Sequence, residues 1–192
     1  MKKLLITGFD PFGGEAINPS WEAVKQLPDA IGDFALCKLM IPTVFGKAAD
    51  TVLEAAAAFQ PDVILCIGQA GGRAAVTPER IAVNIRHARI PDNAGNQPQN
   101  AFVEAAGPAA YFTTVDVPKI VDAIALADIP ADISNSAGAF VCNDVLYSLL
   151  HRYHGTATKV GFIHVPYLPQ QGTPSLTLEQ IILALTAAIT AC

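Results

Sequence analysis

Cys142 lies where a run of small residues meets a helix-like run, in the stretch AGAFVCND (137–144). Of the other cysteines, Cys37 and Cys66 lie within apolar strand-like runs, where free cysteine usually packs in the core, and Cys192 is the last residue. The free N–H groups and partial positive charge of a helix N-terminus favour a thiolate and can stabilise an oxyanion. We therefore expect a nucleophile at Cys142, with a small packing residue at a tight junction as the alternative.

A cysteine nucleophile requires a nearby base, and His164 is the best-placed histidine. It directly follows the apolar run KVGFI, although a hydrogen-bonded core histidine would occupy such a position equally well. His151 and His154 lie on a helix-like run without a third metal ligand, so no metal site is predicted. A carboxylate would orient the imidazole, and the residue pattern alone leaves five candidates open: Asp10, Glu15, Glu79, Asp92 and Asp144.

Strand-like and helix-like segments alternate along the chain and have to position these groups. Strands are expected at 2–9, 34–42, 62–68, 80–90, 131–138 and 159–166. Helices are expected at 18–27, 45–59, 117–128, 141–154 and 175–190, the last with Ser175 or Thr177 as its cap.

This alternation predicts an α/β fold over residues 1–192, taken as a single catalytic domain. We expect a three-layer αβα sandwich with a mostly parallel twisted sheet, like that of phosphorylases and hydrolases. Because ligands bind at the carboxyl ends of parallel strands, the segments that carry Cys142 and His164 should meet at one edge of the sheet.

Composition narrows the possible partners. Twelve basic and seventeen acidic residues give a net charge of −5, which disfavours binding to nucleic acid and to anionic membranes. Neither end carries an apolar run long enough for a signal peptide or a membrane span, so we expect a cytoplasmic protein with reduced cysteines. The low charged share of 15% and the irregular stretch 91–114 predict contacts between subunits.

Two glycine-rich loops follow predicted strands, GFDPFGG (8–14) and GQAGGR (68–73). Glycine-rich turns can cradle phosphate, but neither loop matches a nucleotide-binding pattern. The first loop brings Phe9 and Phe12 to the predicted ligand edge, where an exposed pair would stack on a flat neutral ligand. The alternative is a simple turn with one of the two rings in the core.

Five motifs occur together and in order: TGFDPFGG, GQAGGR, PERIAVN followed by ARIPDN, GAFVCND, and GFIHVPYLP. With them the chain resembles, over nearly its whole length, the type I pyroglutamyl peptidases, also called pyrrolidone-carboxylate peptidases. The resemblance implies that Cys142 is the nucleophile, His164 the general base and Glu79 the acidic third member, with Arg89 beside the oxyanion. It also implies a set of residues that bind the pyrrolidone ring: Phe9, Phe12, Asn18, Gln69, Phe140 and Val141. His87 is a local departure, because many relatives carry an acidic residue there.

The enzyme implied by this resemblance is a cysteine exopeptidase. It hydrolyses the N-terminal pyroglutamyl residue from peptides and proteins through a thioacyl intermediate on Cys142, without metal or cofactor. Its implied partners are pyroglutamyl peptides and further copies of the chain, in a homotetramer or dimer. Two other functions fit the residue pattern: a nucleoside phosphorylase-like enzyme, which would need phosphate ligands, and a catalytically inactive module that binds a small ligand.

Overall fold

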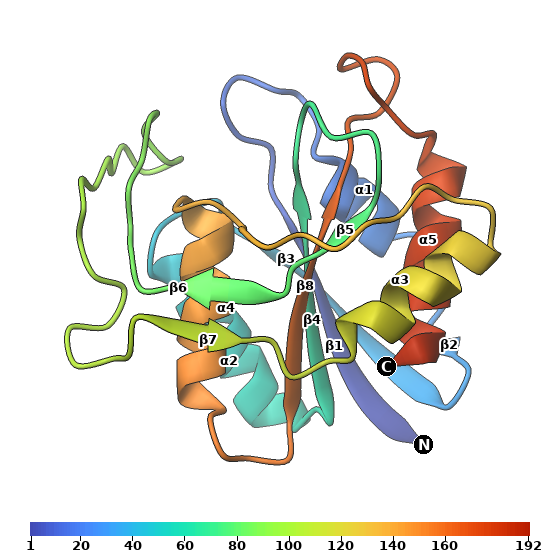
Figure 1. Cartoon of the computed structure of the whole chain (residues 1–192), viewed down its shortest axis with the longest axis horizontal. Coiled ribbons are helices and arrows are strands. Elements are labelled where there is room, and N and C mark those ends of the chain that lie inside the picture. Colours follow the sequence, from blue (N-terminus) through green and yellow to red (C-terminus); the bar gives the residue numbers. More distant parts are fainter.

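The computed structural model describes residues 1–192 and has three layers, with a six-stranded sheet between two sets of helices (Figure 1). In spatial order the strands are β2 (Ala30–Ile31), β3 (Phe34–Ile41), β1 (Lys2–Phe9), β4 (Val63–Gln69), β8 (Lys159–Val165) and β5 (Thr77–Pro78). The four central strands are parallel, and the two short edge strands are antiparallel to their neighbours. The predicted α/β fold with a mostly parallel sheet is confirmed.

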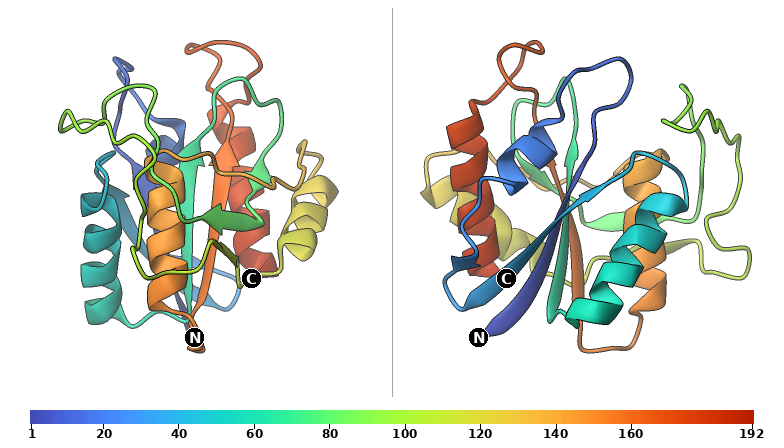
Figure 2. Two further views of the ribbon diagram at one scale, coloured as in Figure 1. Left: turned by 60° about the vertical axis from the view of Figure 1, so that its left-hand side comes forward. Right: turned by 180° about the vertical axis from the view of Figure 1, so that it is seen from behind.

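Helices cover both faces of the sheet (Figure 2). One face carries α1 (Pro19–Val24), α3 (Val117–Leu126) and α5 (Leu178–Ala191), and the other carries α2 (Lys47–Phe59) and α4 (Val141–Arg152). Helix α5 begins with a capping box between Thr177 and Gln180, so Thr177 is the cap that the chain uses. None of the helices combines the length and the apolarity that crossing a bilayer requires.

Alternate residues of the central strands point into the two separate cores. In β1, Leu4 and Ile6 pack on the side of α1, α3 and α5, whereas Leu5 packs on the side of α2 and α4. In β8, Phe162 points to the same side as α4. His164 is two residues further on, so it also faces α4, the helix that carries Cys142.

Two of the predicted strands are wrong. Only Ile81–Val83 of the segment 80–90 forms a strand, β6, which pairs with β7 (Ala110–Phe112) in a separate two-stranded sheet. The strand ends there because the Asn84 side chain binds the backbone of the loop that precedes β7. It accepts a hydrogen bond from Val103 N and donates one to Gly107 O. The segment 131–138 pairs only at two isolated bridges, Ala131 with Val76 and Ser134 with Glu79, on either side of the two-residue strand β5.

Candidate active site

The ends of β4 and β8 bring the site together at the carboxyl edge of the sheet. Gly68 of β4 is the register partner of His164 in β8. A methyl group built on Gly68 would lie 3.1 Å from the Cys142 sulfur and 2.7 Å from Phe162 Cζ. The thiol therefore rests directly over Gly68, beside the strand position that carries the histidine.

Glu79 reaches His164 from the antiparallel edge strand. Thr77 of β5 pairs with His164, and two residues later the Glu79 N–H donates to Phe162 O at 2.8 Å. The carboxylate is fully buried, and its Oε1 lies 2.6 Å from His164 Nδ1. With Nδ1 donating to this carboxylate, Nε2 of the imidazole is the nitrogen left to accept a proton.

Cys142 is the second residue of α4, and no side chain caps the start of this helix. The N–H groups of its first turn are therefore left for a ligand. The side chains of the two residues after the cysteine fix the start of α4 to the neighbouring loops and to β6. Asn143 binds the backbone of Val83 through one donated and one accepted hydrogen bond, both 2.9 Å, and buried Asp144 accepts from Gly46 N at 2.7 Å and from Arg86 Nε at 2.6 Å.

The ionisation of these groups differs from the sequence-based expectation in one respect. Burial, with a smaller contribution from the Glu79 charge, raises the pKa of the Cys142 thiol to about 12, so the expected thiolate at the helix start is wrong. Burial also lowers the pKa of His164, against the opposing effect of its bond to Glu79. Burial works to raise the pKa of Glu79, but the bonds and charges of His164, Ser134 and Arg73 outweigh it and lower that pKa. The resting site at neutral pH thus holds a thiol, a neutral imidazole and a carboxylate.

A cavity of about 460 Å³ opens over this group and is of the size that small-molecule ligands occupy. Six of the residues proposed from the sequence line it: Phe12, Gln69, Arg89, Phe140, Cys142 and His164. The cavity wall carries two arginines, Arg73 and Arg89, and no carboxylate. Because no acidic group lies within ion-pair distance of Arg89, its guanidinium is available for an anion.

Three residues proposed for ring binding do not line this cavity. Phe9 is only 2% exposed and packs on Phe162 in the core, so the expectation of an exposed Phe9 and Phe12 pair is wrong. Val141 is fully buried as the first residue of α4. Asn18 is the buried cap of α1, and it donates to Asp10 O, which fixes the base of the loop that carries Phe12.

The geometry separates the five carboxylates that the sequence left open. Glu79 alone contacts His164. Asp10, Asp92 and Asp144 each accept a hydrogen bond from the backbone of the loop 43–46, and Glu15 lies near Gln171. Sequence reasoning missed Arg73, although its motif was recognised. A fully buried carboxylate requires a positively charged partner, so the expected role of Glu79 could have directed attention to a nearby arginine such as Arg73.

Comparison with known proteins agrees with this geometry. The family model described as pyroglutamyl peptidase matches residues 2–192. The chain belongs to the pyroglutamyl peptidase family. It is 50% identical to a pyrrolidone-carboxylate peptidase of Bacillus amyloliquefaciens, over 99% of this chain and 92% of the relative. A pyrrolidone-carboxylate peptidase of Levilactobacillus brevis is also 50% identical, over 98% of this chain and 96% of the relative.

Solved structures extend the agreement to the fold. The crystal structure of pyroglutamyl peptidase I from Bacillus amyloliquefaciens matches with a TM-score of 0.97 and 48% identity, covering 100% of this chain and 96% of that chain. The pyrrolidone carboxyl peptidase from Thermococcus litoralis matches with a TM-score of 0.95 and 38% identity, covering 100% and 93%. This pyroglutamyl peptidase is therefore a hydrolase of the cysteine peptidase class that removes N-terminal pyroglutamate, as predicted. None of the relatives named here is a phosphorylase.

Proposed function

We propose that Cys142, His164 and Glu79 carry out the hydrolysis. The observation that supports this most is the 2.6 Å contact between Glu79 Oε1 and His164 Nδ1, with His164 and Cys142 on the wall of one cavity. The buried carboxylate fixes the tautomer in which Nε2 accepts a proton. Since the pKa of Cys142 is raised to about 12, the thiol needs this base during attack rather than before it.

In the first half-reaction the Cys142 sulfur attacks the carbonyl carbon of the pyroglutamyl residue, and the thiol proton moves to His164 Nε2. The tetrahedral oxyanion is stabilised by Arg89 and by N–H groups of the uncapped start of α4, each such donor being worth roughly 10²–10³ in rate. The C–N bond then breaks, and the imidazolium gives its proton to the leaving amine.

In the second half-reaction water attacks the thioester. His164 accepts a proton from the water, the C–S bond breaks, and the sulfur is reprotonated as free pyroglutamate leaves. These steps use protein groups and water alone. They return Cys142 and His164 to the neutral state in which they began.

The cavity wall also supports selection for a blocked N-terminus. A pyroglutamyl residue is an uncharged lactam, and the Phe12 and Phe140 rings, whose centroids are 6.2 Å apart, offer it an apolar wall. Gln69 lines the same cavity and can pair with a polar edge of the lactam, while Phe9 and Val141 support this wall from the core. A free ammonium group would face Arg73 and Arg89 with no carboxylate to bind it.

The role of Cys142 is tested by the release of dye from a pyroglutamyl-dye amide. Wild type, Cys142→Ser and Cys66→Ser are compared, because Cys66 is a fully buried free thiol on the same side of the sheet. We expect loss of activity only for Cys142→Ser. An alanyl-dye amide is the matched substrate with a free ammonium, and the wild type should leave it intact. Equal loss in both variants, or in neither, would sink the nucleophile assignment.

We also propose that residues 1–192 act as one catalytic domain, in the cytoplasm and as a homotetramer or dimer, on peptides and not on nucleic acid. The four free cysteines support a reducing compartment. Phe102 and Phe112, which are 68% and 69% exposed, support a subunit contact along the segment 91–114. Light scattering on wild type and Phe112→Lys tests this contact, and a monomeric wild type would contradict it.

A further inference from the structure

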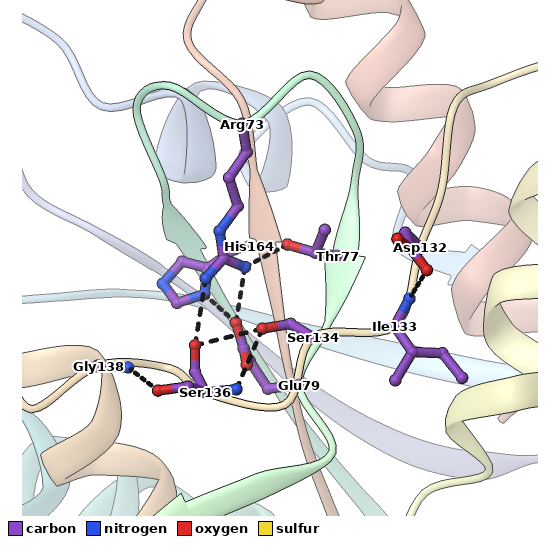
Figure 3. A network of polar contacts seen from close by, with 9 residues as sticks. All are labelled: Arg73, Thr77, Glu79, Asp132, Ile133, Ser134, Ser136, Gly138 and His164. Carbon is purple, nitrogen blue, oxygen red and sulfur yellow. Dashed lines mark hydrogen bonds and ion pairs between the residues drawn. The ribbon is translucent and has the colours of Figure 1, made fainter.

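The Arg73 side chain lies between the base and the segment that leads to the nucleophile (Figure 3). It ends the glycine-rich loop GQAGGR that follows β4. Its Nη1 donates to Glu79 Oε1 at 2.9 Å and to the Thr77 hydroxyl, and its Nη2 donates to the Ser136 carbonyl at 3.2 Å. One guanidinium thus joins β5, the buried carboxylate and the segment 136–140.

The bond to Glu79 brings a fixed positive charge to a buried carboxylate. Glu79 is fully buried, and its second carboxylate oxygen, Oε2, has no hydrogen-bond partner. Both strong contacts therefore fall on Oε1, one from His164 and one from Arg73. Since His164 is neutral in the resting site, Arg73 is the permanent positive charge in contact with this buried carboxylate.

The bond to Ser136 acts on the other half of the site. Ser136 opens the segment whose last residue, Phe140, is followed by the first turn of α4. This segment lines the cavity and is also held by the His87 N–H, which donates to Ala139 O at 2.9 Å, and by the packing of Phe140 on Phe12 and Phe45. The Arg73 guanidinium therefore helps to fix the position of the cavity wall next to Cys142.

We propose that Arg73 is a positioning residue for the reaction, which holds Glu79 ionised against His164 and fixes the segment 136–140 beside Cys142. This inference rests on the proposed roles of Cys142, His164 and Glu79. We assign Arg73 to Glu79 rather than to the substrate, because three of its five N–H groups already donate to Glu79, Thr77 and Ser136. Arg89 has no such partners and remains the cavity's arginine for the oxyanion.

The electrostatic consequence has a definite sign. The hydrogen bond from Arg73 contributes to lowering the pKa of Glu79, and the Arg73 charge contributes to lowering that of His164, although burial is the largest influence on each group. Removing the guanidinium raises both pKa values. Protonation of either group prevents His164 from accepting the thiol proton. Replacing Arg73 by a neutral residue should therefore move the acid limb of the kcat/KM profile to higher pH.

The test compares Arg73→Met, Arg73→Lys and Arg80→Met by pH profiles of kcat/KM on the pyroglutamyl-dye amide. Arg80 is the matched control, because its Nη1 binds Asn135 Oδ1 at 3.0 Å in the neighbouring stretch without contacting Glu79. For Arg73→Met we expect a loss of roughly 10- to 100-fold at neutral pH, part of the ~10²–10⁴ that a general base contributes, and an acid limb at higher pH. Arg73→Lys should keep the wild-type acid limb with a reduced kcat, and Arg80→Met should match wild type throughout.

Glu79→Gln separates this inference from the roles on which it rests. If Glu79→Gln keeps wild-type activity, the proposed triad fails. If Glu79→Gln is impaired while Arg73→Met keeps the wild-type acid limb, only the inference about Arg73 is overturned. In the Glu79→Gln background, Arg73→Met should cost less kcat/KM than in wild type, because the bond to Glu79 is already lost and only the Arg73 charge near His164 and the bond to Ser136 remain to be removed. If Arg73→Met does not fold, Arg73→Gln provides the neutral comparison, and an unshifted acid limb there overturns the inference equally.

Discussion

Gly68→Ala should lower kcat strongly and the unfolding free energy only moderately, so it tests the geometry of the active site apart from the stability of the fold. Gly68 ends the buried part of β4, and its added methyl group would lie 2.7 Å from Phe162 Cζ and 3.1 Å from Cys142 Sγ. Ordinary contact begins at 3.4 Å, so the phenyl ring must retreat by about 0.7 Å and the sulfur by about 0.3 Å. The Phe162 ring in turn contacts the His164 ring, with centroids 4.8 Å apart, so the imidazole moves as well.

These shifts set the expected magnitude. A displacement of about 1 Å from the reacting geometry costs up to ~10²-fold in rate, so we expect kcat to fall by roughly 10- to 100-fold. Overpacking a tight core site costs about 1–3 kcal/mol of unfolding free energy, which a folded enzyme can tolerate. The variant should therefore be folded at room temperature and poorly active.

Gly161→Ala is the matched control, because Gly161 lies in the adjacent strand β8 and is equally crowded. Its added methyl group would lie 2.5 Å from Val115 Cγ2, away from Cys142. Urea denaturation and kinetics on the pyroglutamyl-dye amide are measured for both variants. We expect both to lose stability and only Gly68→Ala to lose kcat. A Gly68→Ala enzyme with wild-type kcat, or equal loss of kcat in both variants, would refute the placement of the thiol over Gly68.

Three further outcomes are expected. Urea denaturation should show that the unfolding free energy falls as the pH drops below about 6.5, because the lowered pKa of His164 means that the unfolded chain binds more protons, and His164→Gln should flatten this dependence. An unchanged slope would contradict the buried neutral imidazole. Asn143→Ala should cost about 1–3 kcal/mol and reduce kcat, because it removes the Asn143 partner of Val83 N and of Ile85 O under the start of α4; wild-type stability would exclude that anchoring role. Iodoacetamide should label Cys142 before Cys66, at a rate that keeps rising above pH 8, since the Cys142 pKa is about 12; a plateau below pH 7 would indicate a preformed thiolate.

The sequence predicted what local pattern encodes. The runs of β1, β4 and β8 are apolar on both faces and identify a parallel sheet covered by helices. Because sites form at the carboxyl ends of parallel strands, the sequence also predicted that Cys142 and His164 lie at the same edge. The edge strands β2 and β5 have two residues each, too few to leave a periodic pattern. The segment 131–138 was predicted as a strand, but it forms only two isolated bridges, to Val76 and Glu79 on either side of β5.

Features that depend on distant neighbours were harder to predict. The choice of Glu79 required a contact with a residue 85 positions away, so it came from the family resemblance and not from the local pattern. The thiolate expected at Cys142 came from the field of the helix alone, whereas burial by the surrounding chain raises the pKa. Phe9 was expected at the surface because it adjoins a glycine-rich turn, but its place on the strand face shared with Leu5 directs it into the core.

The position of β8 in the sheet has a consequence for the order in which the enzyme becomes active during its synthesis. Although β8 is the last strand of the chain, it lies between β4 and β5, and it carries His164. Until the ribosome has released these residues, the carboxylate on one side has no imidazole and the thiol on the other has no base. With the proposed roles of Cys142, His164 and Glu79, the growing chain therefore has no activity until β8 is inserted between β4 and β5.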